Sequence, residues 1–335
     1  MGGAGTGFWS QTWRWPWRGS GSPNAAADES RPAATEMPGV SIGGYGLVRT
    51  FAHGALGELH LATDPDTGAP LAIKTVRFHG SELTRERFLR ESKAAARLQH
   101  PGIVRTHAAG LAGRGESAYG WIAMEWVAGS DLVRYTQPTR LLPEPVVIDL
   151  VAHAAEALAH AHEMGVVHRD IKPANLLFDP VHGTLKITDF GCAHLSDGER
   201  SRSGVIAGTP VYMAPEQLAN APVDARCDLY ALGVLLFELL TGRLPFAGAS
   251  LGDLLASMAT QPAPALSSLR PDLPAGLSDL VARLLAKRPE DRPSDAHQLA
   301  LELRRLAGES GLLLAKLGPG EGTMPRPSQP PQKHP

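Results

Sequence analysis

One short segment restricts what this 335-residue chain can be more than any other stretch, and it reads HRDIKPAN at residues 168–175. It places a carboxylate, an ammonium and an amide within one loop, and the tripeptide DFG follows at Asp189. Asp170 can accept a proton from a hydroxyl, and Lys172 can neutralise charge on a phosphate. Asn175 and Asp189 can hold magnesium through oxygen, the ligand type that this hard cation prefers. The segment therefore predicts the chemistry of phosphoryl transfer from a metal–nucleotide complex.

Length, composition and charge narrow the class of protein. A chain in which 43% of residues are hydrophobic can bury one large core or two smaller lobes. The net charge is -2, from 32 basic and 34 acidic residues. So balanced a charge gives no global attraction to nucleic acid or to a membrane surface, and we expect neither as a partner.

Cysteine usage and hydropathy bear on the compartment. Cys192 and Cys227 are too few for a disulfide framework and suit a reducing environment. The longest apolar run, residues 229–240, is shorter than the roughly 20 residues that span a membrane, so it predicts a buried core helix. The N-terminus lacks the apolar core of an export signal. We therefore expect a cytoplasmic protein without a transmembrane segment.

A strand-rich segment begins near Gly44 and contains a glycine loop. Residues 51–62, FAHGALGELHLA, read as strand, tight loop and strand, and a half-buried strand follows at 71–76. Gly54 and Gly57 would let backbone amides approach phosphates without a side chain in the way. Such a loop alone is equally an ordinary glycine hairpin.

The remainder of the chain is predominantly helical in pattern. Apolar spacing predicts a helix over 84–99, a long helix over 143–164 that Gly165 ends, and two closing helices over 275–285 and 295–306. Four histidines, His153, His160, His162 and His168, lie around the long helix. They are spread around it without a cysteine or aspartate to complete a set, so we predict no zinc site there.

Taken in order, these motifs resemble those of the protein kinases, and in particular the bacterial serine/threonine protein kinases, from about Tyr45 to Ala307. The resemblance implies an α+β fold of two lobes: a small antiparallel sheet with one helix, then a larger and mostly helical lobe. It implies these divisions: a leader at 1–40, an N-lobe at 41–126, a C-lobe at 127–308 and a tail at 309–335.

The resemblance also assigns roles to residues. Those implied for catalysis are Lys74, Glu91, Asp170 and Lys172, with Lys74 paired to Glu91, and those implied for magnesium are Asn175 and Asp189. Those implied for the nucleotide are Phe51, Gly54, Gly57, Leu59, Ala72, Lys74, Met124, Glu125, Val127, Asp131 and Leu177. Phe51, Leu59 and Ala72 would form the roof of the adenine pocket, and Leu177 its floor.

Cofactor and substrate follow from the same resemblance: ATP with Mg²⁺, and proteins that carry serine or threonine. Lys172 and Thr209 stand where tyrosine kinases carry different residues, and residues 208–216 resemble the substrate-binding loop of serine/threonine kinases. Asp228 resembles the acid that braces the catalytic loop, and Arg292 the arginine that pairs with Glu216. Protein substrate, activating signal and oligomeric state stay open.

Two other functions compete with an active protein kinase. A nucleotide-binding pseudokinase or scaffold would lack one of the catalytic residues, yet only Ala52, where the family usually has its first loop glycine, departs from the pattern. A small-molecule phosphotransferase would lack the platform at 214–216 and the helix that Asp228 opens. Both features are present.

The leader combines Gly, Ser, Pro and Ala with four tryptophans, Trp9, Trp13, Trp15 and Trp17. Tryptophan beside arginine suits an interfacial anchor or a docking peptide, whereas the biased composition suits an unstructured extension. Met37 could equally be the start of the protein. We expect an unstructured leader that catalysis does not need.

We predict that Ser201 and Ser203 are autophosphorylation sites that activate the enzyme. Arg169, directly before Asp170, needs an anion, and a phosphoserine carries about -1.5 to -2 charges. Members that resemble this chain often carry two phosphorylatable residues one position apart ahead of the Gly-Thr pair, here Gly208-Thr209. Mass spectrometry of the active protein should find both serines modified, and a Ser201→Ala/Ser203→Ala double variant should lose activity. Full activity in that variant would mean that both are ordinary loop residues.

Overall fold

The computed structural model describes residues 39–54, 57–78, 82–190 and 210–309. The leader, the tail, Ser201 and Ser203 lie outside these ranges. The strands are β1 Ser41–Ile42, β2 Tyr45–Gly54, β3 Gly57–Thr63, β4 Pro70–Arg77, β5 Thr106–Ala112, β6 Tyr119–Glu125, β7 Ser130–Asp131, β8 Leu176–Asp179 and β9 Thr184–Ile187. The α-helices are α1 Glu82–Ala95, α2 Glu144–Glu163, α4 Pro215–Leu218, α5 Arg226–Thr241, α6 Leu251–Thr260, α7 Leu266–Leu269, α8 Ala275–Leu284 and α9 Ala296–Glu309. The short 3₁₀ turns are η1 Gly115–Ser117, η2 Leu132–Tyr135, η3 Pro173–Asn175, η4 Pro210–Tyr212 and η5 Pro289–Asp291.

The N-terminal lobe is an antiparallel sheet with the strand order β1-β2-β3-β4-β6-β5. Strand β4 lies between β3 and β6, and its residue Lys74 pairs with Leu59 of β3 and with Ile122 of β6. A lysine in the middle of a sheet is held in position by strands on both sides. The sheet thus fixes where the Lys74 side chain leaves the backbone.

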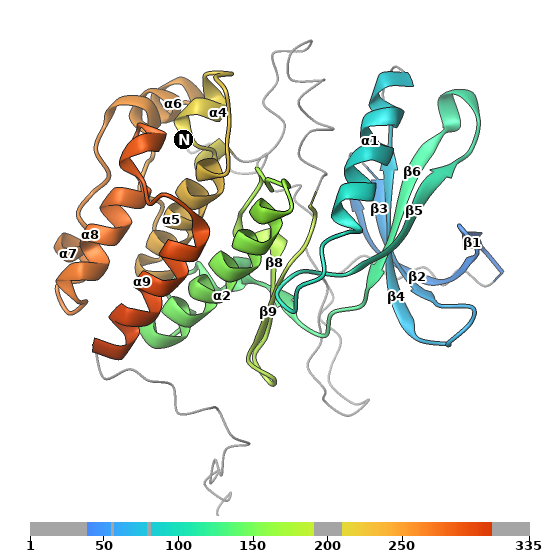
Figure 1. Cartoon of the computed structure of the whole chain (residues 1–335), viewed down its shortest axis with the longest axis horizontal. Helices are drawn as coiled ribbons and strands as arrows, with labels where there is room; N and C mark the ends of the chain where they lie inside the picture. The colour runs from blue at the N-terminus through green and yellow to red at the C-terminus, as the bar shows by residue number, and fades with distance from the viewer. Residues whose placement is uncertain (1–38, 55–56, 79–81, 191–209, 310–335) are drawn as a thin grey trace, which may run out of the picture.

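Helix α1 lies against this sheet, as Figure 1 shows in the part of the molecule coloured blue to turquoise. Its apolar stripe meets the sheet through Phe88, whose ring packs edge-on against Phe78 with 5.4 Å between centroids. The predicted helix over 84–99 ends earlier, at Ala95. Arg97 and Leu98 close tighter turns instead, because their N–H groups bond the carbonyls three residues back.

The C-terminal lobe is built on helices α2 and α5, with α8 and α9 packed around them (Figure 1). Helix α2 buries an alanine-rich face, and α5 is buried nearly all round except at its first residue, its last residue and Glu238. A helix that is apolar all round belongs in a protein core. None of the helices within the described ranges has the length and apolar character needed to cross a membrane.

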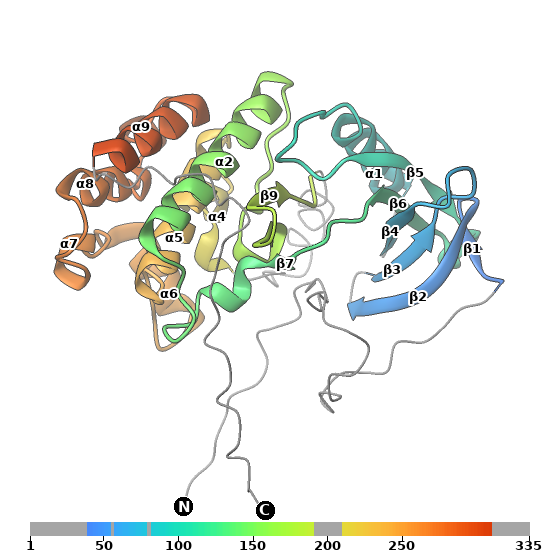
Figure 2. The same ribbon diagram turned by 90° about the horizontal axis from the view of Figure 1, so that it is seen from below.

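A second sheet, with the order β7-β8-β9, lies between α2 and the N-terminal lobe (Figures 1 and 2). The chain enters it directly from β6, and Figure 2 shows this single connection running from one lobe to the other. Val104 and Ile187 join the lobes a second time, because Val104 N–H donates to the Ile187 carbonyl at 2.8 Å. We propose the lobe boundary between residues 126 and 127, since β6 ends at Glu125 and β7 begins at Ser130.

Gly57 shows why the loop between β2 and β3 needs glycine. Its φ of 151° lies in a region that side chains rarely adopt, and a Cβ there would sit 1.9 Å from the Thr75 carbonyl oxygen. The same Cβ would lie 3.2 Å from the Cα of Val76, so the close approach to β4 excludes any side chain. The predicted two-lobed α+β architecture is confirmed.

Glu216 and Arg292 form the buried ion pair that the sequence predicted. Arg292 donates to Glu216 Oε1 at 2.6 Å and to Oε2 at 2.8 Å, in the two-pronged geometry that guanidinium and carboxylate favour. Arg292 is 5% exposed and Glu216 8%. The same guanidinium donates to three backbone carbonyls, those of Ala286, Arg226 and Lys287. The pair therefore ties α4 to the segment between η5 and α9.

Arg292→Met should destabilise the fold by about 3–5 kcal/mol, because it leaves the Glu216 carboxylate buried without a counter-charge. Urea denaturation followed by circular dichroism measures this. The matched control is Arg288→Met, since Arg288 pairs with Glu290 where both side chains are more than half exposed, and its loss should cost about 1 kcal/mol or less. Equal destabilisation by the two changes would contradict a structural role for the buried pair.

Candidate active site

The loop at 168–175 is held by the carboxylate of Asp228, at the start of α5. Asp228 Oδ2 accepts the backbone N–H of His168 at 2.9 Å, and Oδ1 accepts that of Arg169 at 2.7 Å. The imidazole of His162, on α2, donates to Oδ2 at 2.8 Å. Burial alone would raise the pKa of Asp228, but these hydrogen bonds and nearby histidines hold it below its usual value. The fully buried carboxylate of Asp228 thus fixes the backbone of the loop at His168 and Arg169.

Two residues of the site have left-handed backbones. Arg169 has a φ of 65° and Asp189 a φ of 69°, a conformation that is uncommon for residues other than glycine. Such strain persists where the surroundings over-determine it. At Arg169 the bonds to Asp228 do so, together with Gln217, whose amide donates to the Arg169 carbonyl at 2.9 Å.

His168 connects the loop to the segment that carries Asp189. Its Nδ1 accepts the N–H of Asp170 at 3.2 Å, so its Nε2 carries the proton and donates to the Thr188 carbonyl at 2.8 Å. The ring also meets Phe190 edge-on at 4.6 Å. One buried histidine therefore sets the spacing between Asp170 and Asp189.

Asp170 lies at the centre of a small polar cluster. The Lys172 ammonium lies 2.7 Å from Asp170 Oδ2, and the Asn175 amide nitrogen donates to Asp170 Oδ2 at 3.1 Å and to its carbonyl at 2.7 Å. The Asp170 side chain keeps 35% of its surface exposed. It can therefore reach an incoming hydroxyl while Lys172 and Asn175 hold its orientation.

Lys74 reaches across the cleft to Asp189. Its Nζ lies 2.8 Å from Asp189 Oδ1, and both side chains are largely buried, at 8% and 14% exposure. Burial alone would raise the pKa of the Asp189 carboxyl, but the Lys74 charge and hydrogen bond keep it below its usual value. The structure thus pairs Lys74 with Asp189, and the expected pairing with Glu91 of α1 stays a prediction.

Asn175 and Asp189 have the donor set that a magnesium ion needs. The Asn175 amide nitrogen is engaged by Asp170, which leaves its oxygen for a cation, and Asp189 offers a carboxylate that is kept ionised. Magnesium in nucleotide sites takes one or two such protein oxygens and completes its shell with phosphate and water. The residues present therefore fit the metal, and they could hold it between the two lobes.

The residues expected to contact adenine gather at the cleft. Leu59, Ala72, Met124, Val127 and Leu177 belong to one buried cluster that contains side chains of both lobes. Two of the three residues expected in the roof, Leu59 and Ala72, thus share a cluster with the expected floor residue Leu177. Their contact with adenine stays a prediction.

Phe51 and Asp131, both expected to contact the nucleotide, have specific partners within the protein. The Phe51 ring stacks on Trp126 with 5.0 Å between centroids, and the Arg49 guanidinium lies 4.4 Å above Phe51. The sequence pattern did not single out Trp126 or Arg49. The Asp131 carboxylate accepts the Val133 N–H at 3.1 Å, and the residue is only 3% exposed. Its contact with ribose stays a proposal.

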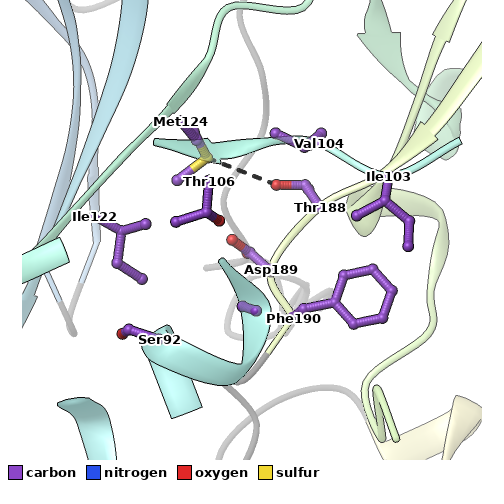
Figure 3. Close-up of a pocket in the computed structure, with 10 residues that line it drawn as sticks. Ser92, Ile103, Val104, Thr106, Ile122, Met124, Thr188, Asp189 and Phe190 are labelled. Carbon is purple, nitrogen blue, oxygen red and sulfur yellow. Dashed lines mark hydrogen bonds between the residues drawn. The ribbon is translucent and has the colours of Figure 1, made fainter. Parts of the chain in front are cut away.

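A cavity of about 20 Å³, the size of roughly one water molecule, lies beside Met124. Figure 3 shows the residues that line it. Its walls come from α1, β5, β6 and the segment at Asp189, and Thr188 Oγ1 donates to the Met124 sulfur across 3.9 Å. Ser92, Thr106 and Asp189 bring polar atoms to it. The inner end of the cleft is thus incompletely filled.

Residues that the sequence reasoning missed join α4 to the catalytic loop, and the segment before α4 to α5. Gln217 accepts the Ala214 N–H at 2.9 Å while its amide nitrogen bonds Arg169, and the Tyr212 hydroxyl donates to Glu238 of α5 at 2.5 Å. The position of Gln217, three residues after Ala214 at a helix start, is the spacing at which a side chain caps the helix. That spacing was a signal present in the sequence.

A scan against protein-family models matches the protein kinase domain over residues 45–302. Among curated relatives, the chain is 35% identical over 277 residues to serine/threonine-protein kinase pkn3 of Myxococcus xanthus, covering 79% of this chain and 50% of that protein. It is 37% identical over 268 residues to the DNA damage-responsive serine/threonine-protein kinase RqkA of Deinococcus radiodurans, covering 78% and 40%. The chain therefore spans half or less of the length of these two relatives.

Solved structures agree. The kinase domain of Mycobacterium tuberculosis PknI superposes with a TM-score of 0.64 at 34% identity, covering 82% of this chain and 100% of that one. A structure of Rad53 residues 1–466 in complex with AMP-PNP superposes with a TM-score of 0.63 at 26% identity, covering 76% and 64%.

Asp228→Ala should destabilise the catalytic loop, because the backbone N–H groups of His168 and Arg169 lose their buried acceptor. Each buried donor left unsatisfied costs about 1–3 kcal/mol, so the free energy of unfolding should fall by roughly 2–6 kcal/mol. The control is Asp224→Ala, an exposed aspartate at the start of the same helix that pairs with Arg226. If chemical denaturation gave the same small loss for both variants, the loop would not depend on Asp228.

Proposed function

Because this chain belongs to the protein kinase domain family, we propose that it transfers the γ-phosphoryl group of ATP to serine and threonine hydroxyls of proteins. The curated relatives that it matches carry the name serine/threonine-protein kinase. The chain spans half or less of their length, so the activity, substrates and partners of the whole protein are part of the proposal.

One observation carries the proposal: the site contains two ion pairs, each between a lysine and an aspartate. The first pair joins Lys74 of β4 to Asp189, which follows β9. The second pair joins Lys172 to Asp170 within the catalytic loop. Asn175 links the second pair to the metal-binding side of the site. Alternating charges of this kind suit a reaction in which negative charge must be held and moved.

In the proposed step, the substrate hydroxyl oxygen forms a bond to the γ-phosphorus while the bond from that phosphorus to the ADP oxygen breaks. Asp170 accepts the hydroxyl proton, and the Lys172 ammonium neutralises charge on the transferred group. Magnesium, held by Asn175 and Asp189, supplies positive charge to the phosphates when it is bound. Alignment and charge stabilisation account for most of the rate in this class of reaction.

We propose that the nucleotide lies between Leu59 and Ala72 above and Leu177 below, with its phosphates under the β2–β3 loop. Backbone groups of Glu125 and Val127 would bond the adenine edge. Gly54, Gly57 and Lys74 would hold the phosphates. Asp131 is a weaker candidate for ribose, since it already caps the turn η2.

Substrate class and regulation follow from the activation segment and the platform after it. Lys172 and Thr209 support serine and threonine over tyrosine, and Ser201 and Ser203 are the proposed autophosphorylation sites. The low cysteine count supports activity in the reducing cytoplasm.

A scaffold without activity is the alternative, and Ala52 was its only support. Ala52 pairs with Leu59 inside β2 and packs on the cluster at the cleft. Within the described ranges the non-glycine residues with positive φ are Arg169, Asp189 and Asn220. The backbone at Ala52 therefore needs no glycine, and the substitution is compatible with a working loop.

The test is Asp170→Asn, which keeps the shape of the side chain and removes its basicity. Phosphotransfer from labelled ATP should fall by roughly 10²–10⁴-fold, the usual effect of losing a general base. Nucleotide affinity by calorimetry should change by less than about threefold, since Asp170 does not touch the nucleotide pocket. Asp66→Asn, in the exposed turn between β3 and β4, is the control and should keep full activity. Unchanged transfer in Asp170→Asn would contradict the proposed role.

A further inference from the structure

A hollow of about 280 Å³ lies at the junction of the two lobes. It is lined by residues that follow α1, by the residue before β5, by the end of β6 and by β9, so both lobes contribute to it. The lining residues are Leu98, Gln99, His100, Pro101, Ile103, Arg105, Glu125 and Lys186. None of the residues assigned to catalysis or to magnesium lies among them.

The charges in this hollow are unequal. Arg105 and Lys186 are cations, and Glu125 is the one carboxylate among the lining residues. The Lys186 ammonium lies 2.6 Å from Glu125 Oε1. The Arg105 guanidinium has no ion pair or hydrogen bond to any residue in the described part of the chain. The hollow therefore carries an excess positive charge on a side chain that can bind two oxygens at once.

His100 adds a hydrogen-bond donor and little charge. Its Nδ1 accepts the Gly102 N–H at 3.0 Å, which places the ring proton on Nε2. Burial and then the neighbouring His160, whose ring stacks on it at 5.5 Å, lower the pKa of His100 below its usual value. Glu156 acts in the opposite direction, while His153 and Lys186 add to the lowering. The ring is therefore neutral near pH 7.

Both the cations and the backbone around them belong to the junction of the lobes. The Arg105 carbonyl accepts the Glu125 N–H at 2.9 Å, so the residue that carries the unpaired guanidinium also holds the end of β6. Ile187, directly after Lys186, donates its N–H to the Gly102 carbonyl at 2.8 Å. A ligand that binds Arg105 and Lys186 together would thus bridge the two lobes beside the end of β6.

We propose that this hollow binds a small oxyanion, a phosphate or carboxylate group, through Arg105 and Lys186 with the His100 ring as a further donor. Arg105 offers a two-pronged guanidinium without a partner, and the Lys186–Glu125 pair is about a quarter exposed on each side. An ion pair that is so accessible to water is weak, so an incoming anion can share Lys186 with Glu125. The volume suits a small ligand, at the lower end of the range of ligand pockets.

The proposed site has a consequence for the cleft, and this part rests on the proposed kinase function. Glu125 and Val127 are the residues whose backbone would bond adenine. An anion that draws Lys186 away from Glu125 would alter the restraint on this segment, so the KM for ATP should change more than kcat. Binding itself can be measured without nucleotide, which separates failure of the site from failure of the kinase proposal.

The experiment is NMR titration of the full chain with inorganic phosphate and, separately, with succinate, at constant ionic strength and without nucleotide or magnesium. Saturable shifts of the Lys186 and Ile103 amides should appear with at least one anion. Response to phosphate alone identifies a phosphate-bearing ligand, and response to succinate alone a carboxylate-bearing one. Either result supports the site.

Arg105→Gln locates the binding. This substitution should raise the Kd for the anion by roughly tenfold or more, the effect of losing a charge-assisted hydrogen bond. Arg140→Gln is the matched control, because Arg140 is also exposed and its side chain has no ion pair within the described residues. Lys74→Met removes a cation of the cleft and should leave the shift at Lys186 in place. Affinity unchanged in Arg105→Gln, a shift lost in Lys74→Met, or shifts that do not saturate with either anion would overturn the proposal.

Discussion

The buried carboxylate of Asp228 is the interaction on which the rest of the site depends. An ionised aspartate inside a helical core is stable only if hydrogen bonds replace the water it has lost. Here two backbone N–H groups and the His162 imidazole do so. The same bonds hold Arg169 in its left-handed conformation, and this turn directs the next residue, Asp170, toward the cleft. The position of the Asp170 carboxylate therefore depends on the buried helix α5, through Asp228.

The cleft adds a second constraint, because its chemistry comes from both lobes. Lys74 belongs to the sheet of the N-terminal lobe and Asp189 to the segment after β9, so their ion pair joins the two lobes. His168 transmits the position of the catalytic loop to the same segment through Thr188 and Phe190. The site is thus built from side chains that are far apart in the sequence and meet only in the folded chain. Several motifs must therefore occur together before the sequence indicates the function.

The two-lobed fold was predictable from the sequence, and so was the contact between Glu216 and Arg292. Both depend on residue types that few other arrangements accommodate. The contact of Lys74 with Asp189 was not predicted, because only the geometry of the lobes brings Asp189 within reach of the lysine. The pairing of Lys74 with Glu91 stays a prediction. The early end of α1 also escaped prediction, since no glycine or proline marks Ala95.

Other features had weaker signals. Gln217 acts through its spacing from Ala214, which is meaningful only once that residue is known to begin a helix. The Phe51–Trp126 stack joins residues that are far apart in the chain, and no local pattern announces such a contact. Gly57 is an instructive case: the sequence suggested that it approaches phosphates, and the structure adds that its close neighbour is the β4 backbone.

The central claim is that this site moves a phosphoryl group to serine and threonine. The most direct measurement is incubation of the purified protein with ATP labelled in the γ-position, magnesium and a mixture of protein substrates, followed by mapping of the labelled residues. The account predicts label on serine and threonine, absent from tyrosine and dependent on magnesium. Release of labelled phosphate without labelled protein, or bound nucleotide that is never turned over, would contradict it.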